Sequence, residues 1–213
     1  MNLDSLLQRP DIWRGGEHCF HDKTRSTSGS CIPTGNDALN RQLPGGGWPL
    51  GALTELLSAH HGIGELQLLM PALAKLSREK RHLAWITPPY LPYAPALAAA
   101  DIQLSRLLFI QTENSHDAFW ATEQLLRSGV CGAVLSWVRI ADVRKLRRLQ
   151  LAAESGGAMG VLFRPLRDAG QSSPAALRLQ LTPSAAGTTV DILKRRGGWN
   201  THPVLIQHHH AVA

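Results

Sequence analysis

The chain lacks the features that mark a membrane-spanning or disulfide-rich protein. No run of about 18 apolar residues occurs in its 213 residues, so we predict no membrane-spanning helix. The first residues, Met1-Asn-Leu-Asp-Ser5, lack the basic-then-apolar pattern of a secretory signal. Three cysteines, Cys19, Cys31 and Cys131, are too few for a disulfide framework. With 44% hydrophobic and 18% charged residues, the composition predicts a soluble globular protein with one α/β domain.

The sequence also lacks a recognisable metal or catalytic motif. His18-Cys19-Phe-His21 with Cys31 match no standard zinc spacing, and the adjacent His60-His61 seldom converge on one ion even with Glu65 nearby. Histidines 208–210 have no rigid frame, and no Ser-His-Asp or Cys-His arrangement follows from spacing. Glu55, at the end of a predicted strand, is interpreted as a capping or pairing residue because we identify no partner acid. We therefore predict no metal, no cofactor and no catalytic residue.

Positive charge is abundant, and it is clustered. The net charge of +6 and the isoelectric point near 9.7 suggest an acidic partner, either nucleic acid or an acidic protein patch. In a predicted helix, Val143, Leu146 and Leu149 or Gln150 turn one face inward, and the cations follow the other face. For this helix, a solvated cationic face is favoured over contact with phosphate. A second basic cluster, at 194–196, precedes Trp199, which either stacks on a base or anchors the tail. The possible nucleic-acid contacts are Arg144, Lys145, Arg147, Arg148, Lys194, Arg195 and Arg196.

We expect a short amphipathic helix over residues 3–13. Leu3, Leu6, Leu7 and Trp13 recur at near-helical spacing, although Pro10 must bend or divide the helix. Either this helix binds a partner or it folds back on its own domain. The polar run that follows is typical of a linker. The predicted organisation is an interaction helix at 1–14, a linker at 15–31, a core at 32–207 and a disordered tail at 208–213.

From residue 52 the pattern alternates strand and helix, which predicts a mostly parallel sheet covered on both faces. Pro71 lies inside the first helix, so we expect a kink there or a helix that restarts with Pro71 in its first turn. Three later strands, at 177–181, 188–193 and 203–207, should extend the sheet antiparallel. The other predicted strands are 52–57, 82–87, 106–111, 132–137 and 159–164, with helices at 65–80, 94–100, 116–128 and 141–154.

A glycine-rich loop follows the first of these strands and reads Ser58-Ala-His-His-Gly-Ile-Gly-Glu-Leu66. Together with the entry segment at 32–51 it resembles the nucleotide-binding core of RecA. In a working loop of this kind, backbone amides surround phosphate, a lysine neutralises charge and a hydroxyl holds magnesium. When the loop is aligned with the RecA pattern without a gap, Gly64 takes the lysine position and Glu65 takes the hydroxyl position. When the alignment is shifted by one residue, Glu65 takes the lysine position. A carboxylate therefore faces a site meant for triphosphate, where like charges repel by several kcal/mol at about 4 Å. The residues of this degenerate loop are Ser58, Gly62, Gly64 and Glu65.

Five segments, two of them in the stretch already described, carry a resemblance that covers most of the chain. This resemblance is to ImuA, the RecA-like accessory protein of translesion synthesis. The part from Leu68 to Pro165 also resembles SulA, the cell-division inhibitor of the same damage response. The segments that carry the resemblance to ImuA are Leu43-Pro-Gly-Gly-Gly-Trp-Pro-Leu-Gly51, Gly62-Ile-Gly-Glu65 with Leu68-Leu-Met-Pro-Ala-Leu73, Ala84-Trp-Ile-Thr-Pro-Pro-Tyr90, Leu126-Arg-Ser-Gly129 with Ala133-Val-Leu-Ser-Trp137, and Gly157-Ala-Met-Gly-Val-Leu-Phe-Arg-Pro165.

The resemblance implies a RecA-like three-layer core that has lost its ATPase chemistry. The family places a glutamate after the second strand, where this chain has Thr87-Pro88-Pro89. It places a metal-holding aspartate where this chain has Ser136, and a nucleotide-sensing glutamine where it has Arg164. If the lysine of the loop is counted as well, four parts of the phosphoryl-transfer apparatus are replaced in this chain. We therefore expect no ATP hydrolysis.

The resemblance to ImuA implies a non-enzymatic scaffold in the bacterial cytoplasm, active in SOS-induced mutagenesis. Its expected partners are a Y-family-like polymerase subunit (ImuB type), an error-prone DnaE-type polymerase and RecA, with self-association also open. The alternative is a SulA-like inhibitor of the tubulin-like division protein. A nucleotide binder and a DNA-binding protein are further alternatives. The first contact surface we expect is the N-terminal helix, and the second is the proline-bounded loop with Tyr90 and Tyr93, at the sheet edge where α/β proteins bind ligands.

Overall fold

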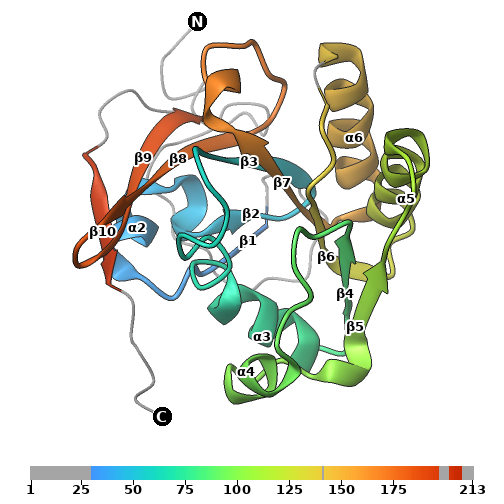
Figure 1. The fold of residues 1–213 in the computed structure, drawn as a ribbon, viewed down its shortest axis with the longest axis horizontal. Helices are drawn as coiled ribbons and strands as arrows, with labels where there is room; N and C mark the ends of the chain where they lie inside the picture. The colour runs from blue at the N-terminus through green and yellow to red at the C-terminus, as the bar shows by residue number, and fades with distance from the viewer. Residues whose placement is uncertain (1–29, 141, 197–201, 208–213) are drawn as a thin grey trace, which may run out of the picture.

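One eight-stranded sheet with helices on both faces forms the body of the protein (Figure 1). The computed structural model describes residues 30–140, 142–196 and 202–207. The predicted N-terminal helix with Leu3, Leu6, Leu7 and Trp13, most of the predicted linker, Trp199 and the tail lie outside these residues. No described helix is long and apolar enough to span a bilayer.

The central part of the sheet is parallel, as the alternation of strands and helices predicts. Its order is β10-β9-β8-β3-β7-β6-β4-β5, so β5 and β10 are the two edges. Strands β3 and β6 are buried along almost their whole length, because both faces of the sheet are covered. The five predicted strands are observed as β3 (Ala52–Ser58), β4 (His82–Ile86), β5 (Leu107–Ile110), β6 (Cys131–Ser136) and β7 (Met159–Pro165).

The three late strands differ in part from the prediction. Strand β8 (Leu177–Ser184) pairs with β3 in parallel, whereas an antiparallel extension was expected. Only β9 (Gly187–Arg195) on β8 and β10 (Val204–Gln207) on β9 are antiparallel pairs. The reason is that the 166–176 segment, which begins with the turn η3 (Leu166–Asp168), returns the chain to the edge of β3 in the same direction. The direction of a strand that follows a loop cannot be read from its side-chain pattern.

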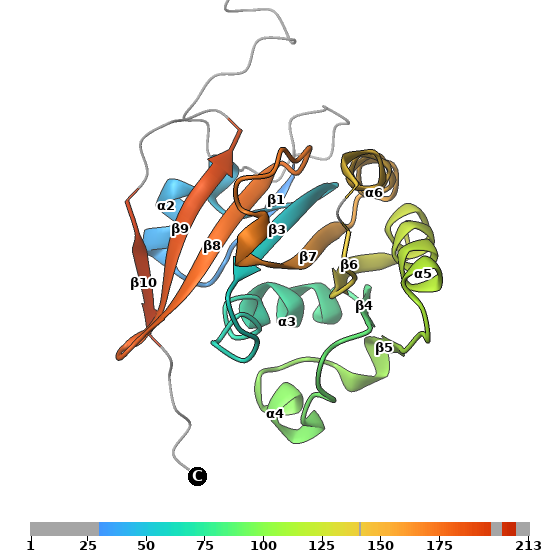
Figure 2. The ribbon, with the colours of Figure 1, turned by 45° about the horizontal axis from the view of Figure 1, so that its top comes forward.

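Helices α3 (Met70–Arg78) and α4 (Ala94–Ala99) pack on one face of the sheet, and α5 (Ser115–Arg127) and α6 (Val143–Gly156) on the other (Figure 2). Helix α3 begins at Met70, later than the predicted start at 65, and the expected restart with Pro71 in the first turn of the helix is confirmed. Pro71 occupies its first turn, where a fixed φ and a missing N–H cost nothing. The residues before it form turns, with Met70 N donating to Leu66 O at 3.0 Å.

The segment that precedes β3 is folded against the first face. It comprises β1 (Cys31–Ile32), α2 (Asp37–Gln42), η1 (Pro44–Gly46), and β2 (Trp48–Pro49), which pairs with β1. Strand β1 includes Cys31, one residue before the predicted core boundary, and Cys31 pairs with Pro49. Helix α2 is capped by the Asn36 side chain, which accepts from Leu39 N.

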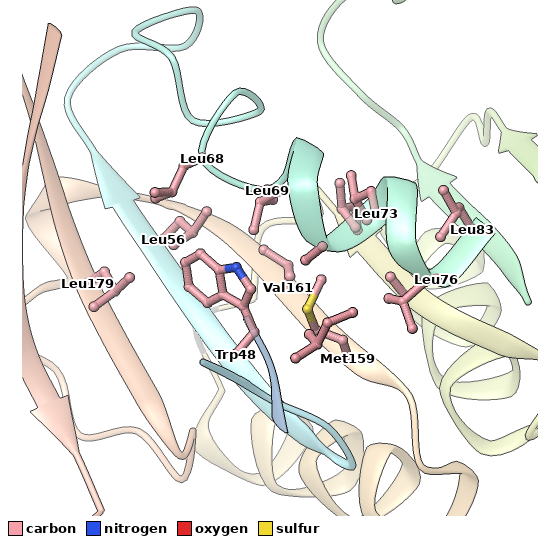
Figure 3. Packing of buried hydrophobic residues seen from close by; sticks show 14 of the residues in the cluster. Trp48, Leu56, Leu68, Leu69, Leu73, Leu76, Leu83, Met159, Val161 and Leu179 are labelled. Carbon is pink, nitrogen blue, oxygen red and sulfur yellow. The ribbon is translucent and has the colours of Figure 1, made fainter. Parts of the chain in front are cut away.

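Two apolar clusters hold the layers together, one on each face. On the first face Trp48, Leu56 and Leu73 converge with residues of β7 and β8 (Figure 3). On the second, Leu53 and Leu162 pack under α5 and α6. Burial of these large side chains contributes about 1.5–3 kcal/mol each, which makes the sheet a rigid base for the loops at its carboxyl edge.

Candidate functional site

The loop after β3 is closed by its own carboxylate. Glu65 Oε1 accepts from Gly62 N and Oε2 accepts from Ile63 N, both at 2.8 Å. Gly62 and Gly64 have φ of 79° and 97°, a region in which glycine is favoured, and these values turn the loop back on itself. The Glu65 side chain is buried, with only 6% of the residue exposed. The amides that would face phosphate in a nucleotide-binding loop are therefore paired within the chain.

Neighbouring groups fix the loop in this closed form. Ser58 Oγ donates to His60 O at 2.8 Å, so this hydroxyl also has an internal partner. Thr188 Oγ1, from β9, donates to Ile63 O and ties the loop to the late strands. Leu68 and Leu69 anchor the end of the loop in the first core cluster. The glycine turns of this loop thus hold an internal anion, the Glu65 carboxylate.

A second polar cluster lies across the middle of the sheet, around Glu55. Both oxygens of this buried carboxylate accept from arginines: Oε1 from Arg164 Nη1 at 2.9 Å and Oε2 from Arg178 Nε at 2.7 Å. Ser173 Oγ donates to Oε1 at 2.6 Å. Glu55 is completely buried, and the arginines are 3% and 6% exposed. Buried charges of this kind are stable only when fully paired.

The arginines connect this cluster to the 166–176 segment. Arg164 Nη2 donates to Asp168 Oδ2 and to Gln171 Oε1, each at 3.0 Å. Arg178 donates to the backbone oxygens of Asp168, Ala169 and Gln171 at 2.9–3.0 Å. The cluster thus clamps this segment onto β3, β7 and β8. The interpretation of Glu55 as a strand-end residue is wrong, because it is the fourth residue of β3 and its partners are two arginines more than 100 residues away in the sequence.

Ser136, which the resemblance to RecA places at the position of a metal-holding aspartate, is part of the core. Its hydroxyl lies 3.0 Å from Thr122 Oγ1 of α5, and both residues are fully buried. The pair presents no negative charge to a cation, and the Thr122 hydroxyl also donates to Ala118 O. Among the described residues, no group of three His, Cys, Asp or Glu could hold a metal ion. His60 and His61 are both exposed loop residues.

A depression of about 250 Å³ lies at the carboxyl ends of β4, β5 and β6. Thr87 lies on its wall with φ of 45°, an uncommon conformation for a β-branched residue and a typical sign of a functional turn. Trp137, another lining residue, stacks on Phe163 with ring centroids 4.1 Å apart. The lining residues are Thr87, Gln111, Thr112, Glu113, Asn114, Ser115, Ala118, Trp137, Val138 and Arg139.

The loop 87–93 next to this depression is the most exposed apolar segment of the described chain. Tyr90, Leu91 and Tyr93 are 72%, 85% and 73% exposed. Prolines at 88, 89, 92 and 95 restrict its backbone, so the aromatic rings are displayed with little conformational freedom to lose. The sequence placed Tyr90 and Tyr93 at this edge, and Leu91 is the residue that it missed.

Two of the four cations in the first basic cluster make side-chain contacts within the chain, and Val143, which was expected to face inward, is 45% exposed. On α6, Arg148 donates to Glu123 of α5, and both Lys145 and Arg148 lie over the Phe119 ring, 5.4 and 5.1 Å from its centroid. Arg144 and Arg147 are exposed on the same helix.

In the second basic cluster, at the end of β9, all three cations make contacts within the chain. Lys194 Nζ donates to Ser173 O at 2.7 Å, Arg195 donates to Gln42 O, and Arg196 pairs with Glu154 at 3.8 Å. Burial and the neighbouring Arg178 lower the pKa of Lys194 below its ordinary value. A role for either cluster in binding nucleic acid stays a prediction.

Comparison with known proteins identifies a family for this chain. The family model described as "Cell division inhibitor SulA" matches residues 51–160, just over half of the chain. A cell division inhibitor SulA from Serratia proteamaculans is 31% identical over 118 residues, which cover 55% of this chain and 70% of that protein. The SulA of Yersinia pestis is 30% identical over the same shares, and that of Edwardsiella piscicida 32% identical over 46% of this chain and 58% of its own.

Among solved structures, SulA from Pseudomonas aeruginosa is 29% identical, with a TM-score of 0.44, over 53% of this chain and 97% of that one. The translesion scaffold expected from the resemblance to ImuA is therefore wrong, because the family model and these relatives are cell division inhibitors. The expected polymerase and RecA partners stay untested predictions. Through residues 51–160, which contain the closed loop, Ser136 and the loop 87–93, the chain belongs to the SulA cell division inhibitor family.

Proposed function

We propose that this protein inhibits cell division by binding the tubulin-like division protein, without hydrolysing nucleotide. The observation that carries the proposal is family membership over residues 51–160. Relatives of which this chain covers 70% are named cell division inhibitors. The matched region includes both the closed loop and the exposed loop 87–93, so the segment that would touch a partner lies inside the shared part.

The closed loop supports action by binding alone. An incoming phosphate would have to displace the Glu65 carboxylate from Gly62 N and Ile63 N, and it would meet that negative charge at close range. Helix α3 starts only at Met70, so its positive end is not placed directly after the glycine turns. We therefore assign the core to the RecA-like class, as a form without ATPase activity. In this form the glycine-rich loop after β3 has a structural role.

The loop 87–93 supports a protein partner. Tyrosine is enriched among the residues that dominate binding energy, because its ring buries a large area and loses few rotamers. Tyr90 and Tyr93 flank Leu91 on a proline-restricted backbone beside the depression at the carboxyl edge. Of the described residues, these three form the most exposed apolar group, and we place the main contact with the division protein there.

Expression in a rod-shaped bacterium tests the proposal. Cells that make the full chain should grow as long filaments without division septa, and no polymerase partner should be needed. The same chain with Tyr90→Ala and Tyr93→Ala should leave cell length normal at equal protein level. Normal division in cells that accumulate the folded wild-type chain would refute the proposal.

A further inference from the structure

Helices α5 and α6 lie side by side on the second face of the sheet and expose a band of positive charge (Figure 2). This basic band comprises residues 118–127 of α5 and 143–153 of α6. Its α6 part has no acidic residue, and its α5 part has a single one, Glu123, which is buried. The other acidic residues of the two helices lie at the helix ends. The exposed cations of the basic band are Arg127, Arg144, Lys145, Arg147 and Arg148.

The buried carboxylate of Glu123 holds two of these cations in place. It accepts from Arg127 Nη2 at 3.1 Å and from Arg148 Nε at 3.2 Å, and Arg148 Nη2 donates to its second oxygen. Lys145 and Arg148 also lie over the Phe119 ring. The Arg127 and Arg148 side chains nevertheless remain 54% and 58% exposed. One anion thus positions two guanidinium groups, and the excess positive charge faces solvent.

Arginine accounts for four of the five cations, and its side chain suits phosphate. The planar guanidinium donates two parallel hydrogen bonds to the oxygens of a phosphate or a carboxylate. Arg144 and Arg147 are three residues apart, and Arg148 follows Arg144 by four, so all three project from one side of α6. The basic band therefore offers a row of phosphate donors along this helix.

An exposed tryptophan in the basic band favours nucleic acid over an acidic protein as the partner. Trp120 is 58% exposed and precedes Glu123 by three residues and Arg127 by seven, so these side chains share one side of α5. An aromatic ring among cations is an arrangement that binds single strands, because every unpaired base has a face on which the ring stacks. A duplex keeps its bases stacked on one another, and a carboxylate-rich protein surface offers no base.

We propose that the basic band binds single-stranded nucleic acid, with its arginines on phosphates and Trp120 stacked on a base. The sequence of α6 by itself favours a solvated cationic face. The structure adds Arg127 and Trp120 from a second helix, and this combination carries the proposal. The tyrosines of the loop 87–93 lie outside the basic band, so the proposal is independent of the division-inhibitor function.

Fluorescence anisotropy of the full chain with labelled oligothymidylate and oligouridylate, each of about 20 nucleotides, tests the binding. The dissociation constants should be on the order of micromolar at about 50 mM salt. The logarithm of the binding constant should fall against the logarithm of the salt concentration with a slope of about −2 or steeper, as roughly three or more phosphate contacts predict. Binding of either polymer supports the proposal, and the tighter one identifies the ligand as DNA or RNA.

Two results of this titration would overturn the proposal. One is the absence of binding to both polymers at about 100 μM protein and low salt. The other is displacement of the oligonucleotide by polyglutamate at an equal concentration of negative charge, which would identify the basic band as a surface for acidic proteins.

Charge reversal with a matched control tests where the strand lies. Arg144→Glu with Arg147→Glu should weaken binding at least tenfold, because two exposed cations become anions. Arg41→Glu with Lys80→Glu also lowers the net charge from +6 to +2, but at exposed residues in α2 and after α3, on the other face of the sheet. This control should bind within about threefold of wild type, because salt screens distant charges. Equal losses in the two double variants would show attraction by net charge alone and overturn the proposal.

Trp120 has a test that a purely electrostatic surface would fail. Trp120→Ala should weaken binding of oligothymidylate at least fivefold and leave both the salt slope and the affinity for a duplex of the same length unchanged. Trp120→Phe should keep most of the affinity, because its ring also stacks. Circular dichroism of each variant verifies the fold. If Trp120→Ala binds the single strand as wild type does, or loses the single strand and the duplex equally, the proposal is overturned.

Discussion

Glu65 accepts a hydrogen bond from the backbone amide of Gly62 at 2.8 Å, three residues back in the same loop. Its other oxygen accepts from the next amide along the chain. A glycine-rich turn of this shape gathers amides around an anion, and here the anion is part of the chain. The loop is therefore complete without a ligand, and its role in this protein is to connect β3 to α3 in a fixed conformation.

Replacing this carboxylate should loosen the loop. Glu65→Ala removes the acceptor for two amides in a partly buried turn, and we expect the free energy of unfolding to fall by about 1–3 kcal/mol. Urea denaturation followed by circular dichroism measures it. Glu113→Ala, at an exposed glutamate, is the matched control and should change stability by less than about 0.5 kcal/mol. Equal stability of the Glu65 and Glu113 variants would show that the carboxylate does not support the loop.

The buried cluster around Glu55 should be far more sensitive. Glu55→Ala leaves Arg164 and Arg178 buried without their shared anion, and we expect a loss of about 3–5 kcal/mol or failure to fold. Glu55→Gln keeps the shape and one acceptor, so its loss should be smaller. Thermal and urea unfolding of the two variants give the comparison. If Glu55→Ala unfolds at the wild-type midpoint, the arginine clamp has no structural importance.

Much of the fold could be predicted from the sequence, because apolar runs such as 52–57 and 132–137 alternate with helical patterns. The start of α3 could be anticipated only in part. Pro71 predicts a kink in the helix or a helix that restarts with Pro71 in its first turn, and the restart is observed. No local sequence signal predicts that the residues before Pro71 form turns. The direction of β8 depends on where the 166–176 segment crosses the sheet, and that crossing is fixed by Arg178 and Glu55, which are 123 residues apart.

The candidate site was predicted less well than the fold. The sequence placed Glu65 in a glycine-rich loop that lacks a cation. It could not show that the Glu65 carboxylate itself binds the amides of this loop, because that contact depends on the backbone angles of Gly62 and Gly64. It treated Arg164 as a lost glutamine, and it treated Glu55 as a capping or pairing residue at a strand end without naming its partners. Both residues pair over distances in the sequence that no spacing rule covers.

The exposed tyrosines should matter for function and little for stability. Tyr90→Ala with Tyr93→Ala removes two rings that are 72% and 73% exposed, so the unfolding midpoint should hardly change. Binding to the division protein should weaken by about 1.4 kcal/mol or more per ring, at least tenfold in affinity. Titration calorimetry with the purified division protein measures the effect. Trp120→Ala, at another exposed aromatic on α5, is the control and should bind as wild type does.

Cys131 should lower stability at alkaline pH. Burial in β6 raises the pKa of its thiol above the ordinary value of 9.0. The folded thiol therefore keeps its proton where the unfolded thiol loses it. Its contribution to stability is fully present below about pH 9 and is lost as pH rises through the folded pKa. Urea midpoints should fall above about pH 9, less steeply in Cys131→Ala than in wild type. Identical slopes in the two proteins would contradict this assignment.

Assembly of the purified tubulin-like division protein tests the central claim most directly. Polymers are collected by centrifugation in the presence of its nucleotide, with rising amounts of this chain. We predict that polymer is lost as the chain approaches equimolar amounts, that ATP makes no difference, and that the chain with Tyr90→Ala and Tyr93→Ala leaves polymer intact. Undiminished polymer at a large molar excess of the folded wild-type chain, or inhibition that requires hydrolysis of ATP by this chain, would contradict the account.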